Sequence, residues 1–103
     1  MAVAQLFRAL GDPSRLEMVQ RLSSGQVYTI NSISKDLEIT RQGARKHLQI
    51  LADADLIFLE THGRETKVRL NRQSLEEGRA FIAEMERRWD VRLEALRQFV
   101  DGE

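Results

Sequence analysis

Apolar residues recur every three or four positions through the first half of the chain, and this spacing predicts a series of short helices. The first predicted helix, residues 1–10, carries Leu6, Phe7 and Leu10 on one face, and Gly11 ends it. A helix this short cannot be stable alone, so its apolar face must pack against another part of the fold.

A second helix begins at the pair Asp12 and Pro13. Aspartate accepts backbone N–H bonds as an N-cap, and proline at the first helical position sacrifices no hydrogen-bond donor. The inner face of this helix is predicted from Leu16, Val19 and Leu22, which lie at helical spacing.

A third helix follows a segment whose structure the pattern leaves open. Residues 27–30 fit either a short strand or an extended link. Thr29 can cap a helix with Ile30, Ile33 and Leu37 on its inner face. The chain then makes a tight connection to the next helix.

The fourth predicted helix spans residues 41–52, with Thr40 as its N-cap and Ala44, Leu48 and Leu51 inside. Two short helices joined by about four residues, the second basic outside, are the pattern of a helix-turn-helix. The outer face of this fourth helix consists of Arg41, Gln42, Arg45, Lys46 and Gln49.

After residue 55 the apolar period shortens to two. Residues 56–60 and 66–70 are predicted strands, joined by a loop over residues 61–65 whose glycine suits a hairpin turn. A hairpin directly after a helix-turn-helix makes a winged helix. The predicted fold is therefore mainly α with a small β-hairpin, in a single domain covering residues 1–103.

A long last helix is predicted over residues 74–100, about 40 Å at 1.5 Å per residue. A head of about 70 residues cannot cover both ends of such a rod, and large exposed apolar patches are rare in monomers. These side chains therefore meet the first helix or a second chain, with packing entirely within one chain as the alternative. The predicted homodimer seam consists of Leu6, Phe7, Leu10, Trp89, Leu93, Leu96, Phe99 and Val100.

The formal net charge is zero, with 16 basic and 16 acidic side chains. This neutrality is a cancellation: residues 1–40 are neutral, residues 41–72 carry +3 and residues 73–103 carry −3. Charges act over roughly 8–10 Å at physiological salt, so the basic middle segment can attract a polyanion although the molecule as a whole is neutral.

This chemistry favours double-stranded DNA as the partner. The major groove admits one helix, where arginine pairs with guanine and glutamine with adenine, and a helix N-terminus suits phosphate. A basic wing can bind the backbone or the minor groove. Two alternatives stay open: a merely solvated helix face, and a winged-helix module that binds protein and no DNA. The predicted DNA-binding residues are Thr40, Arg41, Gln42, Arg45, Lys46, Arg64 and Lys67.

Other functions find no support in the composition. The chain has no cysteine, so it has no thiolate metal site and no thiol nucleophile. His47 and His62 lack zinc-ligand spacing, and His47 is either a hydrogen-bonded structural histidine or a DNA contact. No phosphate loop and no nucleophile–base pattern occur, so we expect neither an enzyme nor a cofactor.

We expect a cytoplasmic location and no membrane partner. The absence of cysteine in so small a domain favours a reducing compartment. The first ten residues lack the basic head, apolar run and cleavage site of a signal peptide. No apolar stretch approaches the roughly 20 residues that span a bilayer.

Two segments resemble a known family. Residues 9–16 read ALGDPSRL and residues 39–51 read ITRQGARKHLQIL, and the three residues His62-Gly63-Arg64 follow in the hairpin. Together they resemble the arsenical-resistance-repressor (ArsR) family of bacterial winged-helix regulators. The resemblance implies a recognition helix at Arg41–Lys46, a wing at Thr61–Lys67, and dimers formed through the first and last helices. It also implies a repressor that leaves DNA when an inducer binds.

The sequence departs from that family at several positions. Metal-sensing members carry cysteines in the third helix or Asp and His ligands on the last helix, and this chain has neither. The family often has serine at Arg45, so we expect an altered base preference. It usually has glycine at Asp55, where aspartate tolerates a left-handed backbone better than most residues do.

The identity of any small-molecule effector stays open. A two-fold dimer is expected to read an inverted-repeat operator, with half-sites centred about 10 bp or a multiple of 10 bp apart.

Overall fold

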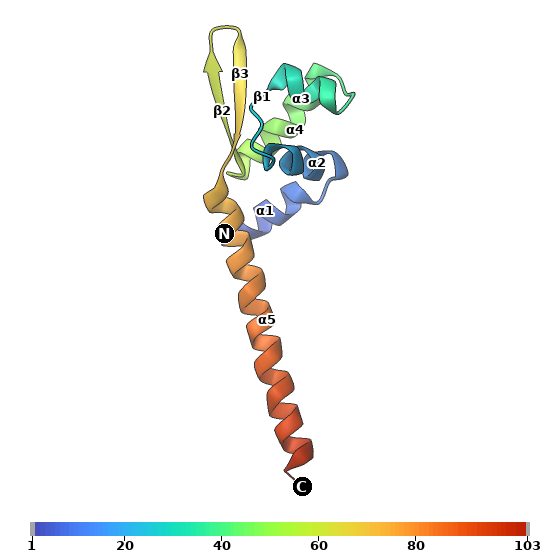
Figure 1. Ribbon diagram of the computed structural model, residues 1–103, viewed down its shortest axis with the longest axis vertical. Coiled ribbons are helices and arrows are strands. Elements are labelled where there is room, and N and C mark those ends of the chain that lie inside the picture. Colours follow the sequence, from blue (N-terminus) through green and yellow to red (C-terminus); the bar gives the residue numbers. More distant parts are fainter. Residues whose placement is uncertain (1, 103) are drawn as a thin grey trace.

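The computed structural model describes residues 2–102. Within these residues, four helices and a three-stranded antiparallel sheet form a head from which a fifth helix projects, and the molecule measures 70 × 23 × 23 Å (Figure 1). The predicted fold class, mainly α with a small β-hairpin, is confirmed. The elements are α1 (Ala2–Leu10), α2 (Pro13–Leu22), β1 (Tyr28–Thr29), α3 (Ile30–Asp36), α4 (Arg41–Asp53), β2 (Ile57–His62), β3 (Glu65–Leu70) and α5 (Arg72–Asp101).

Helices α2, α3 and α4 begin at the positions that their predicted capping residues indicated. Asp12 accepts hydrogen bonds from the backbone N–H groups of Ser14 and Arg15, and Thr29 forms a capping box with Ser32. Thr40 accepts a hydrogen bond at the third residue of α4. These side chains satisfy the first backbone donors of each helix, which have no partner within the helix itself.

The core lies between α2, α3, α4 and the sheet. Met18, Ile33, Leu48 and Leu51 are fully buried in it. The predicted inner position of Leu16 is wrong: this side chain is 45% exposed, and Met18 occupies the inner face instead. Helical spacing alone allowed both faces, and the packing of α2 against α4 selects the one that carries Met18.

The hairpin is longer and its turn is tighter than predicted. Residues 61–65 were expected to form a loop, but Thr61 pairs with Thr66 and His62 pairs with Glu65. The turn therefore contains only Gly63 and Arg64, and the φ of Gly63 is +61°. A two-residue hairpin turn needs a positive φ at its first central residue, and threonine favours continued strand pairing. The open question at residues 27–30 is answered by β1, which pairs with β3.

Asp55 has the left-handed backbone that was expected of it, with a φ of +60°. Its carbonyl oxygen accepts hydrogen bonds from Asn71 Nδ2 at 2.8 Å and from Ser74 Oγ at 2.5 Å. Asn71 is also the N-cap of α5. This turn therefore fixes the start of the long helix to the end of α4.

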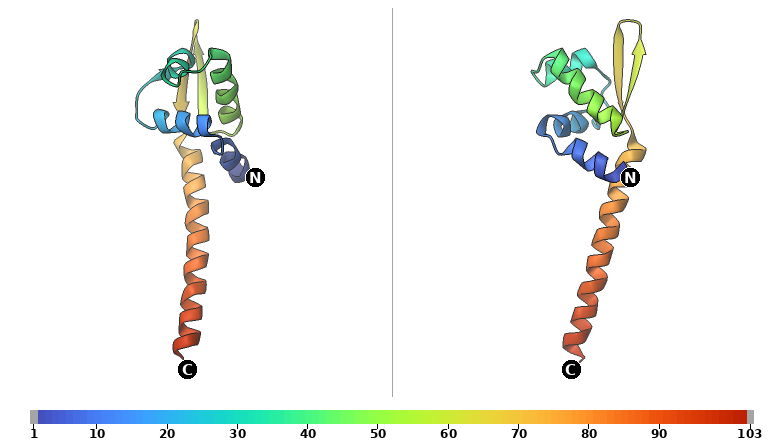
Figure 2. Two further views of the ribbon diagram at one scale, coloured as in Figure 1. Left: turned by 90° about the vertical axis from the view of Figure 1, so that its right-hand side faces the viewer. Right: turned by 180° about the vertical axis from the view of Figure 1, so that it is seen from behind.

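The first turns of α5 pack on α1 within the same chain, and the rest of α5 extends clear of the head (Figure 2). A Cβ placed on Gly78 would lie 3.3 Å from Leu6 Cδ2, so the missing side chain permits the close approach. The rings of Phe7 and Phe81 are 5.9 Å apart. Within residues 2–102, no helix is long and apolar enough to cross a membrane.

Candidate nucleic-acid interface

The outer face of α4 is exposed along its length. Ala44, Leu48 and Leu51 are fully buried, so the opposite side of the helix must face solvent. At the start of the helix, Thr40 Oγ1 accepts a hydrogen bond from Gly43 N at 3.0 Å, and a Cβ on Gly43 would lie only 3.1 Å from that oxygen. Four of the predicted side chains share the exposed face: Arg41, Gln42, Arg45 and Lys46.

The wing reaches over the beginning of α4, and together they enclose a small polar cavity of about 140 Å³. Arg41 and Arg45 line it from α4, and Arg64 lines it from the tip of the wing. Arg64 is distant from Arg41 and Arg45 in the sequence and comes close to them because the hairpin folds back beside the helix-turn-helix (Figure 1). The cavity is completed by Thr29, Ile30, Asn31, Glu65 and Thr66.

Asn31 belongs to this site although its sequence gave no direct indication of it. It lies in the first turn of α3 and is exposed. The available signal was its position two residues after the Thr29 cap, where a polar side chain is expected to point away from the core. Its amide can donate or accept a hydrogen bond at the mouth of the cavity.

Among the described residues, the basic side chains of this surface form no ion pair with a carboxylate, although Glu65 also lines the cavity. Across residues 2–102, ion pairs neutralise arginines elsewhere, as at Arg21 with Asp36 and Arg79 with Glu76. Within the same described part of the chain, no ion pair involves Arg41, Arg45, Lys46, Arg64 or Lys67. Their positive field is therefore available to an external anion.

Lys67 does not join the other predicted residues. Successive side chains of a strand point to opposite faces, and Val68, its neighbour on β3, is buried in the core. Lys67 instead lines an open cavity beside Glu60 and Arg69 on the outer face of the wing. That face is partly neutralised, because Arg69 Nε lies 3.0 Å from Glu60 Oε1.

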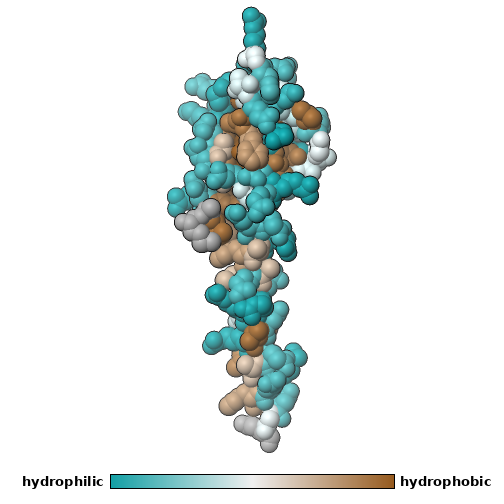
Figure 3. Space-filling model, turned by 90° about the vertical axis from the view of Figure 1, so that its left-hand side faces the viewer, coloured by the Kyte–Doolittle hydropathy of each residue, from teal (hydrophilic) through white to brown (hydrophobic). Residues whose placement is uncertain are grey.

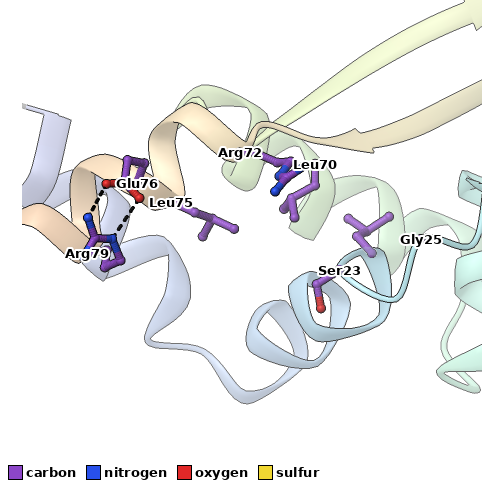
Figure 4. A pocket seen from close by; sticks show the side chains of 8 residues that line it. Ser23, Gly25, Leu70, Arg72, Leu75, Glu76 and Arg79 are labelled. Carbon is purple, nitrogen blue, oxygen red and sulfur yellow. Dashed lines mark hydrogen bonds and ion pairs between the residues drawn. The ribbon is translucent and has the colours of Figure 1, made fainter.

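Among the described residues, the other large cavity does not bring catalytic side chains together. An open cavity of about 740 Å³ lies between the end of α2 and the start of α5, with Leu70 and Leu75 beside it and Arg72 at its edge (Figure 4). Arg79 there is held by Glu76 through two hydrogen bonds. Hydrogen bonding from Arg79 lowers the pKa of the Glu76 carboxyl group. Within residues 2–102 no three His, Asp or Glu side chains lie close enough together to hold a metal ion.

The projecting part of α5 exposes large apolar side chains. Figure 3 shows them recurring down the helix between hydrophilic ones. Trp89 is 59% exposed and Phe99 is 73% exposed. Of the predicted seam, Leu6 is only 2% exposed because it already packs inside its own chain. The predicted seam residues that lie on α5 are all exposed: Trp89, Leu93, Leu96, Phe99 and Val100.

Known proteins share both the sequence and this architecture. Residues 10–60 match the family of helix-turn-helix domains. The HTH-type transcriptional regulator YuzN of Bacillus subtilis is 37% identical over 76 residues, which cover 68% of this chain and 83% of that protein. The arsenical resistance operon repressor of Bacillus subtilis is 37% identical over 59 residues, 57% of this chain and 56% of that protein. The solved structure of an ArsR-like transcriptional regulator from Rhodococcus sp. RHA1 matches with a TM-score of 0.84 and 28% identity, over 95% of this chain and 92% of that one.

Proposed function

The chain belongs to the ArsR family of winged helix-turn-helix transcriptional regulators, and from this premise we propose that it is a homodimeric repressor of an inverted-repeat operator. Residues 1–103 act as one winged-helix domain, with the recognition helix in the major groove and the wing on the backbone or in the minor groove. As a DNA-binding regulator it acts in the cytoplasm, beside the chromosome.

One observation carries the proposal: Arg41, Arg45 and Arg64 converge on one small cavity without any carboxylate partner among the described residues. Guanidinium groups match phosphate geometry with two parallel hydrogen bonds. Duplex DNA offers a phosphate charge about every 1.7 Å along its axis. Arg41 and Arg64 therefore suit a phosphate backbone that passes between the wing and α4, with Arg45 beside them on the face that is proposed to meet the bases.

The other predicted residues divide by what they can reach. Gln42, Arg45 and Lys46 are proposed to contact base edges. The oxygen of Thr40 already accepts a hydrogen bond from the backbone of α4, so its hydroxyl hydrogen is proposed to donate to phosphate. Lys67 faces the other side of the wing, and its proposed part is long-range attraction of the backbone.

The proposed homodimer covers the exposed apolar face of α5. A monomer would leave this face in water over most of the projecting helix, which is costly at about 25 cal/mol per Å² of apolar surface. Phe7 and Leu10 of α1 are half-buried beside the start of this face and complete the seam. Leu6 supports it from within the chain.

The repressor role rests on the likeness to the arsenical resistance operon repressor, which is 37% identical to this chain over 59 residues.

A fluorescence-anisotropy titration of a labelled duplex at two salt concentrations tests DNA binding. A duplex enriched from a random library should bind, and affinity should fall steeply as salt rises, because neutralised phosphates release counterions. A winged-helix module that binds only protein would show no salt-dependent affinity for any duplex.

A further inference from the structure

A single side chain, Arg15, connects three elements of the head. Its Nε donates a hydrogen bond to the carbonyl oxygen of Ala9 in the last turn of α1, at 2.7 Å. Its backbone N donates to Asp12 Oδ2 at 3.1 Å, within the cap of α2. Its Nη1 lies 3.4 Å from Nδ1 of His47 on α4. One guanidinium group therefore joins the first helix to the recognition helix.

The contact with His47 depends on the protonation of the imidazole ring. Arginine can only donate hydrogen bonds, so Nδ1 of His47 accepts this bond only while it carries no proton. Protonation would replace the acceptor with a second cation facing Arg15.

The nearby carboxylate acts in the same direction. Asp12 Oδ2 lies 3.9 Å from His47 Nδ1 and attracts the ring once it is charged. The backbone N–H of Arg15 lowers the pKa of Asp12, which favours the ionised form of this carboxylate. A protonated His47 is therefore drawn toward the cap of α2 and repelled by Arg15.

No other charged group competes at this ring. On α4 itself the positions one turn away are uncharged: Gly43, Ala44, Ile50 and Leu51. Within residues 2–102, His47 makes no hydrogen bond or ion pair beyond those with Arg15 and Asp12, and so none with Arg8 of the neighbouring α1. His47 is 28% exposed, which leaves the ring open to protons from solvent.

We propose that Arg15 and His47 are positioning residues for DNA recognition: their hydrogen bond holds the recognition helix in register with α1, and protonation of His47 releases it. Because α1 lies at the proposed dimer seam, the bond fixes each recognition helix relative to its two-fold partner. The inference rests on the proposed function, since it concerns how two recognition helices are held for one operator. Specific binding should consequently weaken when the pH is lowered enough to protonate this ring.

The test measures the ratio of affinity for an operator duplex, enriched from a random library, to affinity for a scrambled duplex. The ratio removes the sequence-independent attraction that an added positive charge would itself strengthen. A double-mutant cycle uses Arg15→Gln, His47→Leu and the variant that carries both changes. Each single change should lower the affinity ratio about 3- to 10-fold, which corresponds to the loss of one hydrogen bond. The double variant should lose little more than either single variant.

Two further variants separate positioning from folding. In His47→Asn the amide oxygen can accept from Arg15 without titrating, so the ratio at pH 7.5 should be restored and should stay flat down to pH 5.5. The wild-type ratio should fall over the same range. Arg21→Gln is the matched control, because Arg21 shares α2 but pairs with Glu17 and Asp36 and has no contact with α4. Its effect should simply add to that of His47→Leu.

Additive effects of Arg15→Gln and His47→Leu, or coincident pH profiles of wild type and His47→Asn, would overturn this inference while leaving the proposed function intact. A wild-type protein with no preference for any duplex would instead overturn the proposed function, and this inference with it.

Discussion

Single residues differ in what they contribute to the proposed interface, and Arg45 is the most informative of them. It stands on the exposed face of α4 and also lines the cavity shared with the wing, so it is close enough to serve either a base or a phosphate. Its position differs from the serine that the resemblance to the ArsR family leads one to expect. A substitution at this position separates specific contact from simple attraction.

We predict that Arg45→Ala lowers affinity for the selected operator by about 1–3 kcal/mol, the value of one base contact, with a smaller loss on scrambled DNA. Gln49→Ala is the control on the same helix, since Gln49 bonds Asp53 and lies beyond the cavity. Anisotropy titrations of both duplexes measure the difference. An equal loss on scrambled DNA would reassign Arg45 to phosphate contact.

The ionisation of Asp12 is expected to make the stability of the fold depend on pH. The backbone N–H of Arg15 lowers the pKa of Asp12 in the folded chain below its ordinary value of 3.8. The ionised form therefore stabilises the fold, fully above the ordinary pKa, and this stabilisation is lost as the pH falls through the lowered one. Asp12→Ala should reduce the free energy of unfolding at pH 7, and the reduction should shrink toward pH 2.5. Urea unfolding at both pH values measures it; a constant difference would contradict the capping role.

Among the structural elements, the wing offers a matched pair of basic side chains. Arg64 is at the tip and faces the cavity with α4, whereas Lys67 faces outward beside Glu60. We predict that Arg64→Ala reduces the slope of log affinity against log salt by about one unit, and that Lys67→Ala reduces it by less. Titrations at four salt concentrations give both slopes. Equal slopes in the two variants would mean that DNA does not pass between the wing and α4.

The elements themselves could largely be predicted from the sequence, because their signals are local. Asp12, Thr29 and Thr40 cap helices through residues two or three positions away, and Asp55 takes the left-handed backbone for its own steric reasons. The long last helix was visible for the same reason, as one uninterrupted apolar pattern.

Features that depend on distant partners could not be predicted in this way. The length of the hairpin depends on pairing between Thr61 and Thr66, and periodicity within each strand does not show where that pairing ends. The exposure of Leu16 depends on which face of α2 meets α4. Arg15 and His47 are 32 positions apart, and only the packing of α1, α2 and α4 brings them together.

At the scale of the whole molecule, the distribution of charge and apolar surface divides the chain into two ends. The net charge is +3 over residues 41–72 and −3 over residues 73–103. In the proposed dimer the basic heads face DNA, while the acidic helices are held away from phosphate. Arginines along α5 form ion pairs with some of its glutamates, as Arg87 does with Glu84. The hydrogen bond from Arg87 lowers the pKa of Glu84 to about 2.

Because the proposed dimer seam is apolar, we predict that a charge placed within it prevents dimer assembly. Trp89→Asp should convert the dimer to monomers, because it places a charge in the centre of the exposed apolar face. Val91→Asp is the matched control: Val91 is also exposed, but it lies two residues on, about 200° around α5. Sedimentation equilibrium distinguishes the states. Dimers that persist in Trp89→Asp, or an equal effect of Val91→Asp, would place the seam elsewhere.

The most direct test of the whole account is selection of bound sequences from a random duplex library by the full chain, followed by sequencing. A homodimeric, sequence-specific regulator predicts an enriched inverted repeat, with half-sites centred about 10 bp or a multiple of 10 bp apart. A library that emerges without any enriched sequence, or with a single unrepeated site, would contradict it.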